Sequence, residues 1–140
     1  MLQRSRAREV VLQMLYQDDQ HPQPDIKASE KFVRERLHHQ AESVDFALAL
    51  LWGTRRNRTE LDEQLTTSAV NWSLRRMAVT DRNILRLAAF ELLHTHTPRS
   101  VVINEAIELA KRFGSKSSAQ FVNGVLDSLQ PANATQASEE

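Results

Sequence analysis

Cysteine is absent from this sequence of 140 residues, glycine and proline are scarce at three and four residues, and neither sign of charge is in excess. Without cysteine, the chain forms no disulfide framework, thiolate zinc site, iron–sulfur cluster or cysteine nucleophile. No segment approaches the roughly 20 continuous apolar residues of a membrane span, and the N-terminal residues lack the apolar core of a secretory signal. We therefore expect a cytoplasmic protein with the length of one compact domain.

The basic residues are distinctive in type and position rather than in number. The 18 basic and 18 acidic residues cancel, so the molecule as a whole attracts nucleic acid only weakly. Four of the basic residues are lysine and the remaining 14 are arginine, whose planar guanidinium suits phosphate oxygens and base edges. Arg4, Arg6 and Arg8 open the chain, and arginines at 55, 56 and 58 form a second cluster. A locally basic face is therefore available on a neutral protein.

Apolar residues recur at helical spacing along most of the chain, and this periodicity predicts an all-α fold. The expected helices cover residues 5–18, 29–39, 43–67, 80–94, 102–113 and 117–129, with Ser5, Ser43 and Thr80 as N-caps. Residues 69–79 are ambiguous, with room for a short helix around Trp72–Met77. Residues 131–140 lack apolar periodicity, and we expect this tail to be disordered.

Patterns that would indicate catalysis or metal binding are missing. His94 and His96 are two residues apart, so a helix directs them to different sides. Glu105 and Glu108 share a helix face, but the chain lacks the Glu-x-x-His motif of di-iron bundles. No serine stands in a Gly-x-Ser-x-Gly pattern, and no glycine-rich phosphate loop is present. We predict no catalytic residue, no metal site and no cofactor.

The candidates for nucleic-acid binding each have a plainer interpretation. Arg4 and Arg8 are four residues apart and project from one side of a helix, but such a cluster is also typical of a solvated surface. Phe121 is either an exposed platform for a base or a core residue, and its spacing to Val125 favours the core. Tyr16 has the polar tip of a residue at the rim of a core.

Several longer segments carry a resemblance to a known family. They are RARE at 6–9 with Leu15–Tyr16, LLxG at 50–53 with Asn57 and Leu61–Asp62, ILRLA at 84–88 with Glu91–Leu92, VINEAIELAK at 102–111, and Phe113–Gly114 with FVNGVLD at 121–127. Over residues 4–129 the chain resembles the NusB transcription antitermination factors. The two longest segments are the most specific.

The resemblance implies an all-α fold of two small helical bundle subdomains with about six to seven helices. The first subdomain, of three helices, would cover residues 1–68, the second would cover 69–130, and the tail would cover 131–140. The implied function is that of a bacterial factor that binds boxA-type single-stranded RNA of ribosomal-operon transcripts together with NusE, a small-subunit ribosomal protein. The pair then joins RNA polymerase and other Nus factors to suppress termination, without catalysing a reaction.

The resemblance also assigns roles to individual residues. RNA-binding residues would be Arg4, Arg6, Arg8, Tyr16 and Phe121. Asp81, in the first turn of a helix, would contact NusE, because an acidic side chain there is favoured by the helix and suits a basic partner.

Other matched positions have structural expectations or depart from the family. We expect Arg86, Asn104 and Glu105 to hold the second subdomain together through hydrogen bonds and an ion pair. This chain has Ser5 where some relatives have arginine, and Ser117 where some have an acidic residue. Both departures remove a charge near the implied RNA contacts.

Two other functions compete with antitermination. A NusB-like domain also begins the rRNA cytosine-5 methyltransferases, so the chain could be an RNA-binding accessory domain; the lack of cysteine and of a cofactor-binding sheet argues against the transfer step. A helix-turn-helix protein would instead bind duplex DNA through one recognition helix, and no segment has that character. The sequence leaves open whether the free protein is a monomer or a homodimer.

Overall fold

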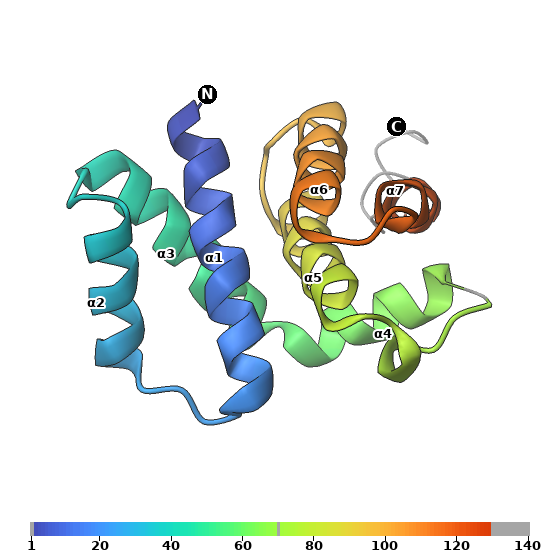
Figure 1. The fold of residues 1–140 in the computed structure, drawn as a ribbon, viewed down its shortest axis with the longest axis horizontal. Coiled ribbons are helices and arrows are strands. Elements are labelled where there is room, and N and C mark those ends of the chain that lie inside the picture. The colour runs from blue at the N-terminus through green and yellow to red at the C-terminus, as the bar shows by residue number, and fades with distance from the viewer. Residues whose placement is uncertain (1, 70, 130–140) are drawn as a thin grey trace, which may run out of the picture. The chain divides into compact units, whose positions relative to one another are not determined.

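The computed structural model describes residues 2–69 and 71–129 (Figure 1). These residues form seven α-helices, one short 3₁₀ helix and no strand, which confirms the all-α prediction and the expected number of helices. The helices are α1 (Leu2–Gln20), α2 (Ile26–Arg36), α3 (Ala41–Arg56), α4 (Arg58–Ser68), η1 (Leu74–Arg76), α5 (Val79–His94), α6 (Arg99–Phe113) and α7 (Ser118–Ser128). The tail at 131–140, for which we expected disorder, lies outside the described residues.

Two compact units divide the chain, residues 1–57 and residues 58–140. The first unit holds α1, α2 and α3, and the second holds α4, η1, α5, α6 and α7. The division lies between Asn57 and Arg58 rather than after residue 68, where the sequence analysis put it. The reason is that α4 packs against α5 and α7, so its apolar face is buried in the second unit.

One long helix over residues 43–67 was expected, and the structure instead forms α3 and α4 with a break at Asn57. The side-chain amide of Asn57 donates to the carbonyl oxygen of Gly53 at 2.8 Å, and its backbone N–H donates to the same oxygen at 3.0 Å. Asparagine favours helix ends because its amide competes for backbone partners. The apolar positions keep helical phase across this break, which is why periodicity alone missed it.

The observed helix starts lie ahead of most of the expected ones. Ser5, Ser43 and Thr80 are inside α1, α3 and α5 and are not N-caps. Helix α2 begins at Ile26, where the Asp25 carboxylate caps it by accepting from the backbone N–H groups of residues 27 and 28 at 2.8 and 3.2 Å. The first turns of these helices are mostly polar, so apolar spacing does not detect them. Among the described residues of the ambiguous segment 69–79 are η1, capped by the hydroxyl of Ser73, and Val79, the first residue of α5.

The first unit is built on the packing of α1 against α3 and α2. Its predicted apolar stripe on α1 is buried: Ala7, Val10, Val11, Met14 and Leu15. A polar bridge joins all three helices, because the Arg55 guanidinium donates to both carboxylate oxygens of Asp18 at 2.8 Å and to the Ser29 hydroxyl at 2.9 Å. Arg55 therefore holds the unit together, although the sequence placed it in a basic surface cluster.

In the second unit, α5 is the central helix and packs against α4, α6 and α7. As expected, Arg86 ties this unit together: its guanidinium donates to the two carboxylate oxygens of Asp62 at 2.7 and 3.1 Å and to the Asn83 side-chain oxygen at 3.2 Å. Asn104, which we grouped with Arg86, is exposed instead. Arg99 adds a second tie by donating to the carbonyls of residues 126, 127 and 129 at the end of α7.

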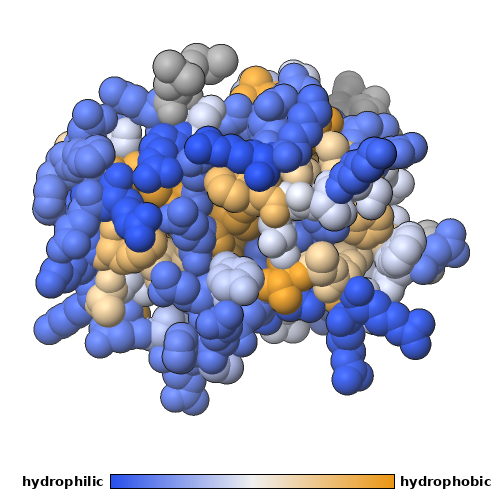
Figure 2. Space-filling model, viewed as in Figure 1, coloured by the Kyte–Doolittle hydropathy of each residue, from blue (hydrophilic) through white to orange (hydrophobic). Residues whose placement is uncertain are grey.

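The visible face of the molecule is covered largely by hydrophilic side chains (Figure 2). Among the described residues, no helix is both long and apolar enough to cross a membrane.

Candidate functional site

The arginines of the N-terminal cluster lie on the first half of α1, but they differ in exposure. The side chains of Arg4 and Arg6 are 52% and 45% exposed. Arg8 is only 4% exposed. The expectation that all three guanidinium groups are available to a ligand therefore fails for Arg8, whose side chain is buried.

Phe46 on α3 explains where the Arg8 side chain goes. The guanidinium carbon of Arg8 lies 5.0 Å from the centre of the Phe46 ring, and that of Arg4 lies 4.6 Å from the same centre. A cation within about 6 Å of an aromatic ring centre is attracted by its negative face. One half-buried aromatic residue of α3 thus contacts two arginines of α1.

Phe46 was not a candidate in the sequence analysis. The buried stripe of α3 includes Val44, Ala47, Leu48 and Leu51, and Phe46 stands outside that stripe. The sequence could have identified Phe46 because it is a large aromatic residue outside the apolar stripe of its helix. An aromatic side chain in such a position packs against polar residues of a neighbouring helix instead of the core.

Carboxylates accompany both exposed arginines. The Glu42 carboxylate on α3 lies 3.9 Å from Arg4, and Arg6 donates to the Glu9 carboxylate one turn further along α1 at 2.9 Å. The Arg4–Glu42 pair is exposed on both sides, so water screens it and it contributes little stability. A polyanion can therefore displace Glu42 at small cost, whereas the Glu9 carboxylate beside Arg6 is only 11% exposed.

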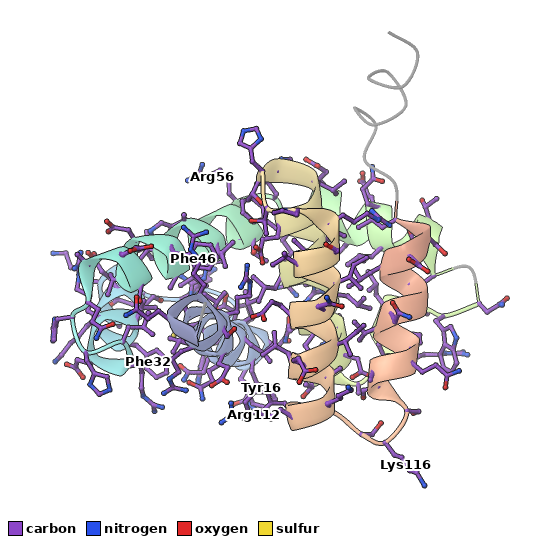
Figure 3. All side chains as sticks on the ribbon, turned by 90° about the horizontal axis from the view of Figure 1, so that it is seen from above. Tyr16, Phe32, Phe46, Arg56, Arg112 and Lys116 are labelled. Carbon is purple, nitrogen blue, oxygen red and sulfur yellow. The ribbon has the colours of Figure 1, made fainter. Side chains whose placement is uncertain are left out.

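Tyr16 is on the same helix as the arginines and is 46% exposed (Figure 3). At a rise of about 1.5 Å per residue, it lies roughly 18 Å along the α1 axis from Arg4. Its exposure fits a residue that can stack on a ligand, and its position extends the candidate surface toward the C-terminal end of α1.

The second unit contains a pocket of about 330 Å³ that includes Phe121. The lining residues come from η1 and its flanks, from the start of α5 and from the start of α7: Trp72, Arg76, Met77, Ala78, Asp81, Ser117, Gln120 and Phe121. The rings of Phe121 and Trp72 meet edge to face, with centres 5.4 Å apart and planes at 71°. Phe121 is half-buried and Trp72 is 57% exposed, so Phe121 is neither a core residue nor an isolated platform.

Asp81 is in the first turn of α5, as expected, but its side chain does not extend into solvent. The residue is 8% exposed and lines the pocket. Its Oδ1 atom is buried and has no hydrogen-bond partner among the described residues. The expectation of a freely exposed carboxylate is therefore wrong, because the pocket wall beside Trp72 and Phe121 encloses it.

The structure thus brings the predicted residues together in two sets. Arg4, Arg6 and Tyr16 are exposed on α1 of the first unit, while Phe121 and Asp81 share a pocket of the second unit. Trp72 and Arg76 belong to that pocket but were not predicted, because the segment around them has no periodicity. Within the described residues, no group of three or more metal-ligating side chains is present.

Comparisons with known proteins identify relatives over nearly the whole chain. A sequence model of the NusB family matches residues 5–131. The transcription antitermination protein NusB of Anaeromyxobacter dehalogenans is 49% identical over 124 residues, covering 89% of this chain and 87% of that protein. The protein of the same name from Koribacter versatilis is 42% identical over 127 residues, covering 90% and 87% of the two chains.

Solved structures agree with the fold. The structure of T. maritima NusB has a TM-score of 0.83 at 34% identity and covers 96% of each chain. The crystal structure of the antitermination factors NusB and NusE in complex with double-stranded RNA has a TM-score of 0.77 at 24% identity, covering 92% of this chain and 96% of that one. At this lower identity, the second comparison supports the fold alone.

Proposed function

The chain belongs to the NusB family of transcription antitermination proteins, and we propose that it binds boxA-type single-stranded RNA of ribosomal-operon transcripts together with NusE. The complex then joins RNA polymerase and other Nus factors in the cytoplasm. The activity is binding rather than catalysis. The observation that carries the RNA-binding part is the pair of exposed guanidinium groups, Arg4 and Arg6, on one end of α1.

Arg4 and Arg6 contact RNA phosphates directly in this proposal. Their guanidinium groups offer forked donors, and the exposed Glu42 carboxylate beside Arg4 is easily displaced. Arg8 has a different role: it packs on Phe46 and supports the helix surface that presents Arg4. Two direct contacts, rather than three, are therefore expected from this cluster.

The aromatic residues supply contacts that do not depend on charge. Tyr16 is exposed on α1, and Phe121 forms part of the pocket wall in the second unit. Bases of single-stranded RNA stack on such rings, and each stacked base contributes about 1–3 kcal/mol. Stacking by these residues would add affinity to the phosphate contacts of α1.

We expect NusE to dock mainly on the second unit. A protein of the same fold forms a solved complex with NusE, and the acidic residue in the first turn of α5 suits a basic partner. Since Asp81 is enclosed, a NusE side chain would reach it only through the pocket. Whether NusE docks on the second unit and whether it contacts Asp81 are therefore tested separately.

The alternative of an accessory domain of an rRNA methyltransferase is less well supported. The relatives that the chain matches over most of their length are antitermination proteins. A gel-shift measurement with boxA-type RNA, with and without NusE and at two salt concentrations, tests the proposal. Binding that strengthens with NusE and weakens with salt is expected; no binding to this RNA under any of the four conditions would refute it.

A further inference from the structure

The pocket of the second unit contains a feature that general RNA binding leaves unexplained. A carboxylate, Asp81, lines a pocket whose walls include two aromatic rings, Trp72 and Phe121. Phosphates do not suit this pocket, because a carboxylate repels them. The ligand must instead offer hydrogen-bond donors and a surface that fits against aromatic rings.

The state of Asp81 points to a missing donor. Burying a carboxylate oxygen without a hydrogen bond is costly, so such groups in proteins nearly always have partners. Oδ1 of Asp81 has none among the described residues, and the residue is more than nine-tenths buried. Rotation about the final side-chain bond of aspartate is soft, so the carboxylate can turn toward a donor in the pocket.

The lining residues favour a flat, neutral ligand over a cation. Arg76 already brings a guanidinium to the same pocket as Asp81, and a second cation would be repelled by it. Trp72 is 57% exposed, which leaves ring surface available for stacking. A volume of about 330 Å³ accommodates one planar heterocycle. A nucleobase meets these requirements, and RNA is the ligand class of the proposed function.

Resting on that proposed function, we propose that this pocket binds an unstacked guanine of single-stranded RNA. The guanine stacks on Trp72, which is 57% exposed, and meets Phe121 at its edge, because the two ring planes lie at 71° and a flat base is parallel to only one of them. Its Watson–Crick edge donates N1–H and N2–H to the Asp81 carboxylate. Proteins read single-stranded RNA by stacking and by hydrogen bonds to this edge. The second unit would then supply base selectivity, and the arginines of α1 would supply sequence-independent affinity.

Guanine is the base that a carboxylate selects. It presents two adjacent donors on one edge, which match two carboxylate oxygens. Adenine and cytosine present one amino group next to an acceptor nitrogen, and uracil presents one N–H between two carbonyl oxygens. Each of these three would place an acceptor against the carboxylate, so only guanine satisfies Asp81 without repulsion.

The test compares short RNAs that differ in one base. Fluorescence anisotropy would measure binding of labelled 12-nucleotide RNAs of uridine whose central residue is guanosine, inosine, adenosine or cytidine. Because hydrogen bonds to a charged group are among the stronger ones, we expect guanosine to bind roughly 10-fold more tightly than adenosine or cytidine. Inosine lacks the N2 amino group, so the inosine RNA should bind several-fold more weakly than the guanosine RNA. This comparison tests the N2–H contact with the wild-type protein.

Protein variants then test whether the preference for guanosine comes from the pocket. Asp81→Asn should bind all four RNAs with similar affinity, because an amide presents a donor to one guanine N–H. Asp127→Asn is the matched control, since Asp127 is exposed on α7 and outside the pocket lining, and it should keep the guanosine preference. Trp72→Ala should weaken guanosine binding by about 5- to 100-fold, and Trp72→Phe should restore most of it.

The outcomes separate this proposal from the proposed function. If the wild-type protein binds boxA-type RNA but shows no guanosine preference, the guanine pocket is wrong and RNA binding stands. If Asp81→Asn keeps the preference for guanosine, Asp81 does not bind the Watson–Crick edge of the base. If Asp81→Asn weakens NusE binding and leaves base preference unchanged, the pocket receives a basic side chain of the partner instead. If no RNA is bound, including boxA-type RNA, both proposals fail.

Discussion

The two units differ in the kind of recognition that their candidate residues can perform. The first unit exposes the side chains of Arg4 and Arg6 near the start of α1, with an exposed carboxylate, Glu42, beside Arg4. The second unit encloses a carboxylate, Asp81, in a pocket with two aromatic rings. Contacts with phosphates depend strongly on salt, whereas stacking and hydrogen bonds to base edges carry sequence information. In our proposal, one small fold divides affinity and selectivity between its two units.

The largest expected effect concerns the polar bridges that hold each unit together. Arg55→Met should lower the free energy of unfolding by about 3–5 kcal/mol, since it leaves the buried Asp18 carboxylate unpaired. Arg86→Met should cost less, because its partner Asp62 is 29% exposed and retains some water. Urea unfolding of both variants measures the difference, with Arg34→Met, which removes an exposed pair with Glu30, as the control. An equal loss in all three variants would contradict the account.

Cooperation with NusE should have the next largest effect. Residues 1–130 contain 18 basic and 16 acidic side chains, a net of +2, once Glu139 and Glu140 are set aside. This small charge attracts RNA weakly, so a basic partner should raise RNA affinity by about 5- to 150-fold, the usual range of such coupling. Titrating RNA into the protein alone and into its complex with NusE measures the factor. Equal dissociation constants would show that the chain binds RNA independently.

A smaller effect is expected from the aromatic support of the arginines. Phe46→Leu keeps an apolar side chain but removes the ring face beneath Arg4 and Arg8. RNA affinity should fall about 2- to 5-fold, in line with an exposed cation–π contact of about 0.5–1 kcal/mol. Phe32→Leu is the matched control, because Phe32 contacts Arg36, an arginine of α2, with a similar geometry at 4.7 Å. A drop of the same size in both variants would remove the role assigned to Phe46.

The smallest effect should come from the carboxylate beside Arg4. Glu42→Gln removes an exposed ion pair with an N–O distance of 3.9 Å, so it should raise RNA affinity by less than about 3-fold. Asp45→Asn, at an exposed position on the same helix, controls for the general loss of negative charge. If both variants raise affinity equally, Glu42 acts only through net charge and does not compete with RNA for Arg4.

Periodicity predicted the helices well because burial of an apolar stripe drives helix packing. It identified the core face of α1, from Ala7 to Leu15, and the central position of Arg86 was implied by the family resemblance. The break at Asn57 was missed because one amide hydrogen bond to Gly53, and not a change of apolar phase, ends α3. Helix starts were missed because the first turns of these helices are mostly polar and extend ahead of the apolar stripe.

Side-chain exposure in the candidate site could not be predicted from local sequence. Arg8 is buried, and its guanidinium contacts the ring of Phe46, 38 positions later in the sequence. Asp81 is buried because residues near 72 and 121 close over it. Both outcomes depend on side chains brought together by the fold, and a single sequence contains no pattern that pairs them.

According to our proposal, the arginines of the first unit bind phosphates and the pocket of the second unit binds a base. The measurement that tests this most directly is a salt titration of boxA-type RNA binding by the wild-type protein and two variants. Arg4→Ala/Arg6→Ala should reduce the slope of log affinity against log salt by about 1.4, from about 0.7 for each lost phosphate contact. Phe121→Ala should lower affinity at every salt concentration and leave the slope unchanged. An unchanged slope in the arginine variant, or an equal change in both variants, would contradict the account.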